Sequence, residues 1–393
     1  MKLISFRIFI LFLFGFLSTE AQTQLTENAE VAIITIGPYQ PEVYSAFGHS
    51  GILVRDASKK INRFYNYGLY DFEQENFFLN FAFGLLKYKV GVNDYRRVFY
   101  YHTSVQNRFV KEQFLNLTLE EKQRFFDFLE ENIKPENAEY IYNYVYNNCA
   151  TKLPEVIDQL FPGRVMYDFS YKVEEKSVRD LMDDYLGFQP WGDFGIDLGL
   201  GQQIDKEADE RTYLFLPDYV HYAIEKATIK RDSVEVPFVS DSKVYPAPKE
   251  EKLKNGVMTP FNVFVVLFFV VGFITNRDFK RRKRTRWIDT ALFSFAGFIG
   301  LWVAFLWFGT DHLSKWNLNI LWALPTHIVV IFLSKKGKLK PFVKNYFKFT
   351  GIWYLILLLI WAILPQPLHM SLVPLVLTMV LRALYLSYDL KGK

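Results

Sequence analysis

Cysteine is the scarcest reactive residue in this chain, because Cys149 is the only one among 393 residues. A lone cysteine cannot form an intramolecular disulfide, and no CxxC or Cys/His spacing is present that would bind zinc. Histidine is also rare, with six in the chain, and the net charge of +4 is too small to indicate a partner. The sequence therefore excludes a disulfide-stabilised scaffold and a cysteine-based zinc site, and it implies no metal or organic cofactor.

Residues 1–21 are typical of a signal peptide. Lys2 and Arg7 precede or interrupt a short apolar run, which ends at a small-residue site near Ala21. The run is only slightly short for a membrane span, so an uncleaved anchor is the alternative. In either case we expect the residues that follow to be exported.

Beyond this segment, long apolar runs are confined to residues 258–393. Five of them approach the roughly 20 residues that are needed to cross the hydrocarbon of a bilayer. They cover 258–275, 288–309, 318–334, 350–364 and 371–386, and prolines interrupt the region of the last two. We therefore predict an all-α membrane domain of about five helices.

Basic residues between these runs predict the orientation of the membrane domain. Clusters of Lys and Arg follow the first run at 277–286 and the third at 335–348. The positive-inside rule places both loops and the C-terminus in the cytoplasm of a multi-pass inner-membrane protein, and residues 22–257 in the periplasm. The cluster RRKRTR is explained by this orientation, so we expect it to contact the lipid bilayer and expect no nucleic-acid partner.

The exported region has the pattern of an α+β domain. Apolar and aromatic runs predict strands at 31–38, 49–56 and 61–70, the last two joined by a hairpin turn. A capping box from Thr118 to Glu121 predicts a helix to about 133, and apolar periodicity predicts helices after Cys149 and at 177–188 and 216–230. Glycine-rich residues 194–205 are expected to form a loop, and polar residues 231–257 a linker, which gives a domain of 22–230.

Cys149 lies in YNNCATKLPEVIDQL, a sequence that predicts a loop leading into a helix. Asn147 and Asn148 are candidate caps, and the positive end of the helix would favour a thiolate. Cys149 is therefore a candidate nucleophile. The alternative is a small, unreactive core residue.

A thiol nucleophile needs a base, and the exported region offers His49, His102 and His221. His49 is the candidate, because Gly48 and Gly51 leave space around it at the mouth of a predicted strand, whereas the other two are typical of ordinary surface or half-buried histidines. Asn66 or Tyr65, on the neighbouring strand, could orient its ring. Asn148 and the Cys149 backbone N–H are candidate oxyanion donors, although the asparagines could instead serve only in capping and turns.

The order of these motifs resembles the circularly permuted NlpC-type papain-like thiol fold, in which histidine precedes cysteine. More closely, SAFGHSGILV, FYNYGLYDF, FFLNFAFGLLKYKV and YIYNYVYNNCATKLP, followed by a multi-span region, resemble the Lnb-type bacterial lipoprotein N-acyltransferases. The resemblance implies transfer of a fatty acyl chain to the N-terminal α-amine of a diacylated lipoprotein. It also implies Cys149 as the nucleophile and His49 as the base, with a phospholipid ester as the acyl donor.

Polar residues near the outer ends of the second and third apolar runs are further candidates. His312, Asn317 and Asn319 lie at the edges of these runs, and His327 lies within the third. Polar groups at such depths are costly unless they have partners, so we predict that His312, Asn317 and Asn319 bind substrate together with Tyr65. The alternative is a solvated loop and a histidine that joins two helices.

Two other classes of protein fit parts of the sequence. A cell-wall cysteine peptidase or amidase would use the same thiol fold, but five apolar runs exceed what such a hydrolase needs. A non-enzymatic membrane sensor or assembly protein would use Cys149 as a core residue and His49 as a turn residue. Both enzyme hypotheses require Cys149 and His49 to meet, whereas the sensor hypothesis does not.

Overall fold

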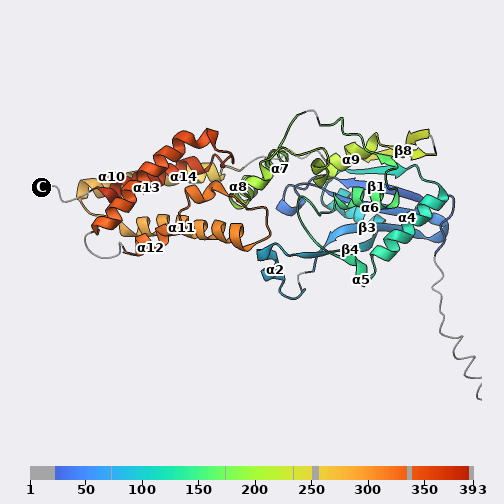
Figure 1. Ribbon diagram of the computed structural model, residues 1–393, viewed down its shortest axis with the longest axis horizontal. Coiled ribbons are helices and arrows are strands. Elements are labelled where there is room, and N and C mark those ends of the chain that lie inside the picture. The colour runs from blue at the N-terminus through green and yellow to red at the C-terminus, as the bar shows by residue number, and fades with distance from the viewer. Residues whose placement is uncertain are drawn as a thin grey trace, which may run out of the picture.

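The computed structural model describes residues 23–388 apart from 72, 173, 233, 250–255 and 334–338, and the predicted signal peptide lies outside these residues. The described chain is elongated, with a sheet-containing domain at one end and a bundle of helices at the other (Figure 1). Helices α7 (Val178–Leu186) and α8 (Pro190–Gly199) lie between the two. The predicted α+β domain followed by an all-α region is confirmed.

An antiparallel sheet of seven strands forms the centre of the first domain, in the order β10-β5-β1-β2-β3-β4-β6. The three strands predicted from the sequence form three adjacent members, β1, β2 and β3, and the predicted turn is a single 3-10 turn at Ala57–Lys59. The strands are β1 (Glu30–Ile36), β2 (His49–Asp56), β3 (Ile61–Leu69), β4 (Lys87–Asp94), β5 (Val110–Leu115), β6 (Glu139–Ile141) and β10 (Val239–Tyr245).

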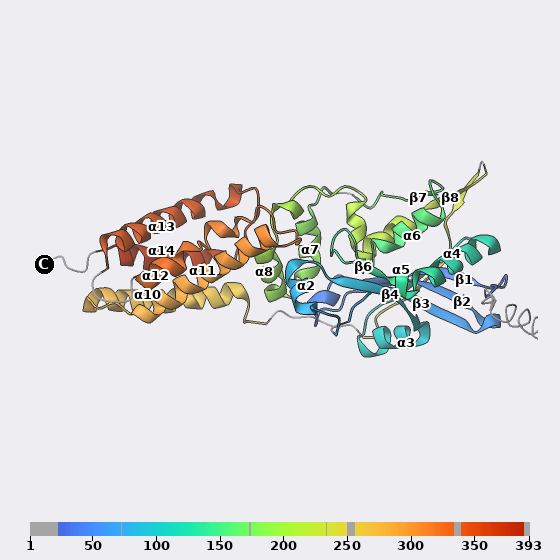
Figure 2. The same ribbon diagram turned by 60° about the horizontal axis from the view of Figure 1, so that its bottom comes forward.

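Helices cover both faces of this sheet because its central strands are apolar on both sides. Ile33, Ile52 and Val54 point to one face and pack with α4 (Leu119–Asn132), α6 (Lys152–Leu160) and α9 (Pro217–Glu225). Leu53 and Phe64 point to the other face, which α3 (Tyr95–Tyr100) covers (Figure 2). Each such side chain contributes about 1.5–3 kcal/mol when it is fully buried.

Local signals set the helix starts of this domain. Thr118 Oγ1 accepts the backbone N–H of Glu121, and the Glu121 carboxylate accepts the N–H of Thr118, which is the predicted capping box. Ser177 and Asp180 form a second box at α7. Short elements complete the domain: α2 (Phe77–Phe83), α5 (Pro135–Ala138), and a second sheet of β7 (Val165–Met166), β8 (Thr228–Arg231) and β9 (Val234–Pro237).

The linker predicted for 231–257 is wrong in its first part. Val234–Pro237 pairs with β8, and Val239–Tyr245 forms the edge of the main sheet against β5. An edge strand exposes most of its side chains, so backbone hydrogen bonds hold it and no alternation of apolar residues reveals it. The helix predicted to reach 230 ends at Glu225 for the same reason, because Thr228–Arg231 joins the second sheet.

The loop predicted for 194–205 is also wrong in its first part, because α8 continues through Gly195 to Gly199. Glycine costs about 1 kcal/mol in a helix relative to alanine. Packing offsets this cost, since the Phe194 ring lies 5.6 Å from that of Phe264 in the membrane region. A Cβ on Gly199 would lie 3.4 Å from Trp302, so its small size permits close contact with the next domain.

The C-terminal region contains the five predicted apolar segments. Three helices are long and apolar enough to cross a membrane, Pro260–Arg281, Arg286–Gly309 and Pro341–Ile363, and two apolar stretches are shorter, Leu318–Leu333 and Leu372–Ser387. The first of the shorter stretches is interrupted before Thr326, where Pro325 follows a 3-10 turn. The α-helices are α10 (Pro260–Arg281), α11 (Arg286–Gly309), α12 (Thr326–Leu333), α13 (Pro341–Ile360) and α14 (Leu372–Ser387).

A buried ionic cluster joins three of these helices. Arg382 of α14 is fully buried and lies 2.6 Å from Asp289 of α11 and 3.2 Å from Asp278 of α10. Arg284 also pairs with Asp289, at 2.6 Å. Charges in such a site are tolerated only as a complete set, because each one left alone is strongly destabilising.

Replacing Arg382 with methionine is expected to lower the free energy of unfolding by about 3–5 kcal/mol, because two buried carboxylates lose the cation between them. Unfolding of the full chain in detergent would measure the change. Arg281→Met removes an exposed cation at the end of α10 and is the control. Equal losses in the two variants would show that the cluster is not important for stability.

Candidate functional site

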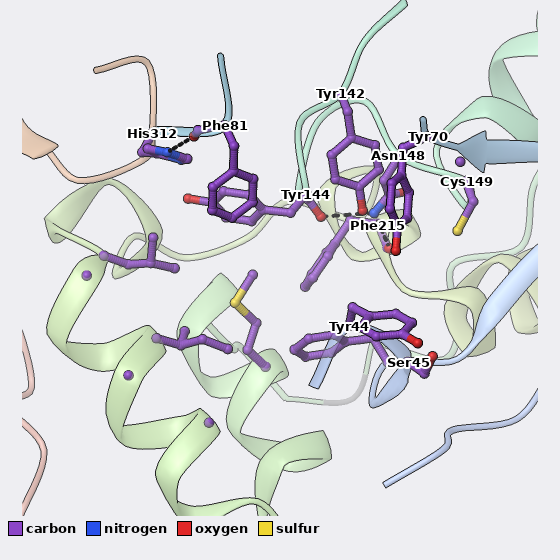
Figure 3. A pocket seen from close by; sticks show the side chains of 18 of the residues that line it. Tyr44, Ser45, Tyr70, Phe81, Tyr142, Tyr144, Asn148, Cys149, Phe215 and His312 are labelled. Carbon is purple, nitrogen blue, oxygen red and sulfur yellow. Dashed lines mark hydrogen bonds between the residues drawn. The ribbon is translucent and has the colours of Figure 1, made fainter. Parts of the chain in front are cut away.

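A cavity of about 790 Å³ lies between the sheet domain and the membrane helices. One part of its wall comes from β2, β3 and the segment before α6, and another comes from α8 and from Trp302, Phe305 and Leu306 of α11. Figure 3 shows Cys149 at one end of the cavity and His312 at the other. The cavity therefore extends from the only thiol of the chain to a membrane helix.

Cys149 and His49 line the same end of this cavity. Both adjoin Gly68 of β3, where an added Cβ would lie 3.7 Å from Cys149 Cβ and 3.9 Å from His49 Cε1. Gly68 has φ of +114°, which a residue with a side chain rarely adopts, and the register of β3 and β4 shifts beside it. The tertiary structure thus brings the two candidate residues together around a glycine that leaves space between them.

Asn66 is the residue that orients His49. Its Oδ1 lies 2.8 Å from His49 Nε2, and with the amide oxygen as acceptor Nε2 carries the proton. His49 Nδ1 is then the unprotonated nitrogen that can accept a proton from a thiol. Asn66 thus has the position of the third group, which orients the imidazole in a thiol–imidazole pair.

Tyr65, the alternative to Asn66, does not reach the imidazole. It is fully buried in the core on the opposite face of the sheet, where its hydroxyl donates to Glu130. Adjacent residues of a strand point to opposite faces, so only one of Tyr65 and Asn66 can meet His49. Tyr65 also does not line the cavity, and its predicted role in substrate binding is not supported.

The Asn148 side chain forms its hydrogen bonds with backbone groups around the thiol. Its Oδ1 accepts the N–H groups of Ala150 (2.8 Å) and Thr151 (2.9 Å), and its Nδ2 donates to the carbonyls of Tyr144 and Phe215. No amide hydrogen is left for a substrate oxyanion, so the alternative of turn chemistry holds for Asn148. Neither asparagine is the cap of α6, because the helix begins after Thr151, and the Asn147 amide donates to the Ile141 carbonyl.

Burial determines the protonation of the pair. It raises the pKa of Cys149 above the ordinary value of 9.0, although backbone N–H groups of Ser50 and Ala150 and the charge of Arg108 act in the opposite direction. Burial, together with the charge of Arg108, lowers the pKa of His49 to about 4. The prediction of a stable thiolate is therefore wrong, and at neutral pH the site holds a thiol beside a neutral imidazole.

Two basic residues of the cavity wall, His102 and Arg108, were not among the predicted site residues. His102 was expected to be an ordinary histidine, yet it lines the cavity with Arg108, and its pKa is lowered to about 4 by burial and then by the Arg108 charge. No local motif marks either residue, because they reach the cavity only when the turn before β5 packs beside β1. His221 lies outside the cavity wall, in α9.

The polar residues at the edges of the second and third apolar runs do not all lie in the cavity wall. His312 lines the cavity, and its Nε2 lies 3.0 Å from the Phe81 carbonyl of α2. Asn317 and Asn319 are almost fully buried and donate to backbone carbonyls at the end of α8, so they do not line the cavity. Their predicted substrate role is replaced by a structural one. His327 joins helices through Tyr346 and Tyr354, as the alternative reading proposed.

Comparisons with known proteins agree with this two-part structure. A family model described as the Lnb N-terminal periplasmic domain matches residues 18–182, and one described as the Lnb transmembrane domain matches residues 251–393. No curated protein and no solved structure matches the chain.

Alkylation of Cys149 by iodoacetamide should be slow at neutral pH and should accelerate only as the pH rises above about 9, because burial raises the thiol pKa. The same chain unfolded in guanidinium provides the reference, with a midpoint near the ordinary value. A midpoint well below that reference would instead indicate a thiolate–imidazolium pair.

Proposed function

Because the chain belongs to the Lnb family and is a membrane protein with an extracytoplasmic domain, we propose that it is a lipoprotein N-acyltransferase. It takes a fatty acyl chain from a phospholipid and transfers it, through a thioester on Cys149, to the N-terminal α-amine of a diacylated lipoprotein. The observation that carries the proposal is the shared cavity, in which a thiol and an imidazole lie at one end and α11 lies at the other.

The proposed reaction starts from the neutral Cys149 thiol and the neutral His49 imidazole. His49 Nδ1 removes the thiol proton as Sγ attacks the ester carbonyl, and the imidazolium returns the proton to the departing glycerol oxygen. The lipoprotein amine then attacks the thioester, forms the amide and regenerates the thiol. Backbone N–H groups of Ser50 and Ala150 adjoin the sulfur and are the available donors for the oxyanion.

The apolar wall of the cavity suits an acyl chain. Phe81, Trp302, Phe305 and Leu306 contribute carbon surface, and Gly195 and Gly199 of α8 leave room beside it. An aliphatic chain gains about 0.8 kcal/mol for each methylene that it buries. A water-poor cavity also protects a thioester from hydrolysis, which a transferase requires.

Helix α2 provides a route between the cavity and the bilayer. Phe78, Leu79 and Phe81 are each more than half exposed, while the Phe83 ring lies 5.5 Å from that of Phe305 on α11. This exposed apolar surface therefore lies next to the end of α11 that faces the sheet domain, as Figure 1 also indicates. We infer that α2 enters the outer leaflet of the inner membrane and that a phospholipid passes beside it. The basic loops and the C-terminus then lie in the cytoplasm.

A cell-wall peptidase is disfavoured by the same cavity. A peptide of the wall is polar and lies away from the bilayer, whereas the thiol here faces a space bounded by membrane-helix side chains. A sensor or assembly protein would have no need for Asn66 to hold His49 next to the thiol.

Cys149→Ala and His49→Ala are each expected to abolish N-acylation, with a loss of at least a hundredfold, and to leave the protein folded. Mass spectrometry of lipoprotein N-termini would measure the product, and hydroxylamine release of labelled acyl groups would detect the thioester on wild-type protein. His221→Ala, a histidine outside the cavity, is the matched control. Free α-amines in equal amounts with and without the gene would contradict the proposal.

Gly195→Phe should reduce transfer of long acyl chains far more than that of short ones. A Cβ at Gly195 meets nothing within 4 Å, so the new ring occupies cavity space without a clash at its root. The ratio of C16 to C6 donor rates is expected to fall at least tenfold. Gly187→Phe, at another open position outside the cavity wall, is the control, and an unchanged ratio at Gly195 would place the acyl chain elsewhere.

A further inference from the structure

Arg108 is a buried cation in the wall of the same cavity. Only 3% of it is exposed, and it lies between η3 (Tyr101–Val105) and β5. Its Nε donates to the Gly37 carbonyl at the end of β1, and its Nη1 donates to Gln106 Oε1 at 3.0 Å. His102 Nδ1 also lies 3.2 Å from Nη1. These three neutral partners fix the plane of the guanidinium and do not neutralise its charge.

The second terminal nitrogen, Nη2, is buried and has no hydrogen-bond partner among the described residues. Two other arginines of the described chain are similarly buried, and each is paired with two aspartates, Arg179 with Asp197 and Asp205, and Arg382 with Asp278 and Asp289. No described carboxylate lies within ion-pair distance of Arg108, and the charge of Glu42 acts on it only from farther away. A desolvated cation without a counter-ion in contact is costly, so an anion is the expected missing partner.

The location of Arg108 identifies the class of anion. Arg108 shares the cavity wall with Cys149, His49 and His102, and its charge lowers the pKa of all three groups. The thiol end of the cavity is therefore positive, while its far wall is apolar. A glycerophospholipid combines these properties, since it carries a phosphodiester and acyl esters on one glycerol, and a guanidinium suits phosphate oxygens.

We propose that Arg108 binds the phosphate group of the acyl donor and so selects phospholipids over neutral glycerolipids. The inference rests on the proposed function, and it goes further by assigning the residue that recognises the donor. Free inorganic phosphate offers the same chemistry, so an experiment has to separate the two sources.

The test measures thioester formation on Cys149 by the full-length chain in detergent, with two donors that carry identical acyl chains. One donor is phosphatidylglycerol and the other is diacylglycerol, which lacks the phosphate. Wild-type protein is expected to prefer phosphatidylglycerol at least tenfold in kcat/KM, mainly through KM. Arg108→Gln should remove that preference, so that the ratio of kcat/KM for the two donors falls to about one, and Arg108→Lys should retain part of it. Arg97→Gln, an exposed arginine on α3, is the matched control.

Each other outcome has a defined meaning. An equal fall for both donors in Arg108→Gln would make Arg108 a structural or general catalytic residue and would overturn the assignment. Inhibition by millimolar inorganic phosphate without any donor preference would indicate a site for the free ion and would also overturn it. If wild-type protein forms no thioester from either lipid, the proposed function itself fails.

Discussion

The position of the membrane helices relative to the thiol depends on the hydrogen bonds that terminate α8. The last carbonyls of a helix have no partner within it. Here Asn317 donates to the carbonyls of Leu198 and Gly199, Asn319 donates to that of Asp197, and Gln366 donates to that of Leu200. All three side chains belong to the membrane region and are fully or almost fully buried. They fix α8, and with it α11, at the mouth of the cavity.

This attachment explains why one cavity can have two chemically different ends. The sheet domain supplies an imidazole, a thiol and a cation. Backbone and amide groups of β1, β2, β3 and the segment before α6 hold them in place. The membrane region supplies aromatic and aliphatic side chains. Helix α8 is packed against α7 through Arg179 and against the membrane region through Phe264. Under the proposed function, rigid elements therefore place the reacting atoms and the acyl chain.

The electrostatics of the site follow from the same burial. Desolvation holds Cys149 as a thiol and His49 as a neutral base, although Arg108 lies close enough to affect both. Under the proposed function, a neutral pair in a buried site suits the formation of a thioester that must be protected from water. The cost of this arrangement is a cation that lacks a carboxylate partner in the described chain.

Local sequence patterns were sufficient to predict the strands around His49, the capping box at Thr118, the five apolar segments and the candidate pair of Cys149 and His49. These depend on local periodicity, turn chemistry and the rarity of one residue type. The choice between Asn66 and Tyr65 as the partner of the imidazole required the tertiary structure, because strand register sets the face of the sheet to which each side chain points. The tertiary structure also decided that Asn148, Asn317 and Asn319 bind carbonyls, that 194–199 is helical, and that Arg108 enters the site. In each case the partner lies far away in the chain, so no local pattern contains the information.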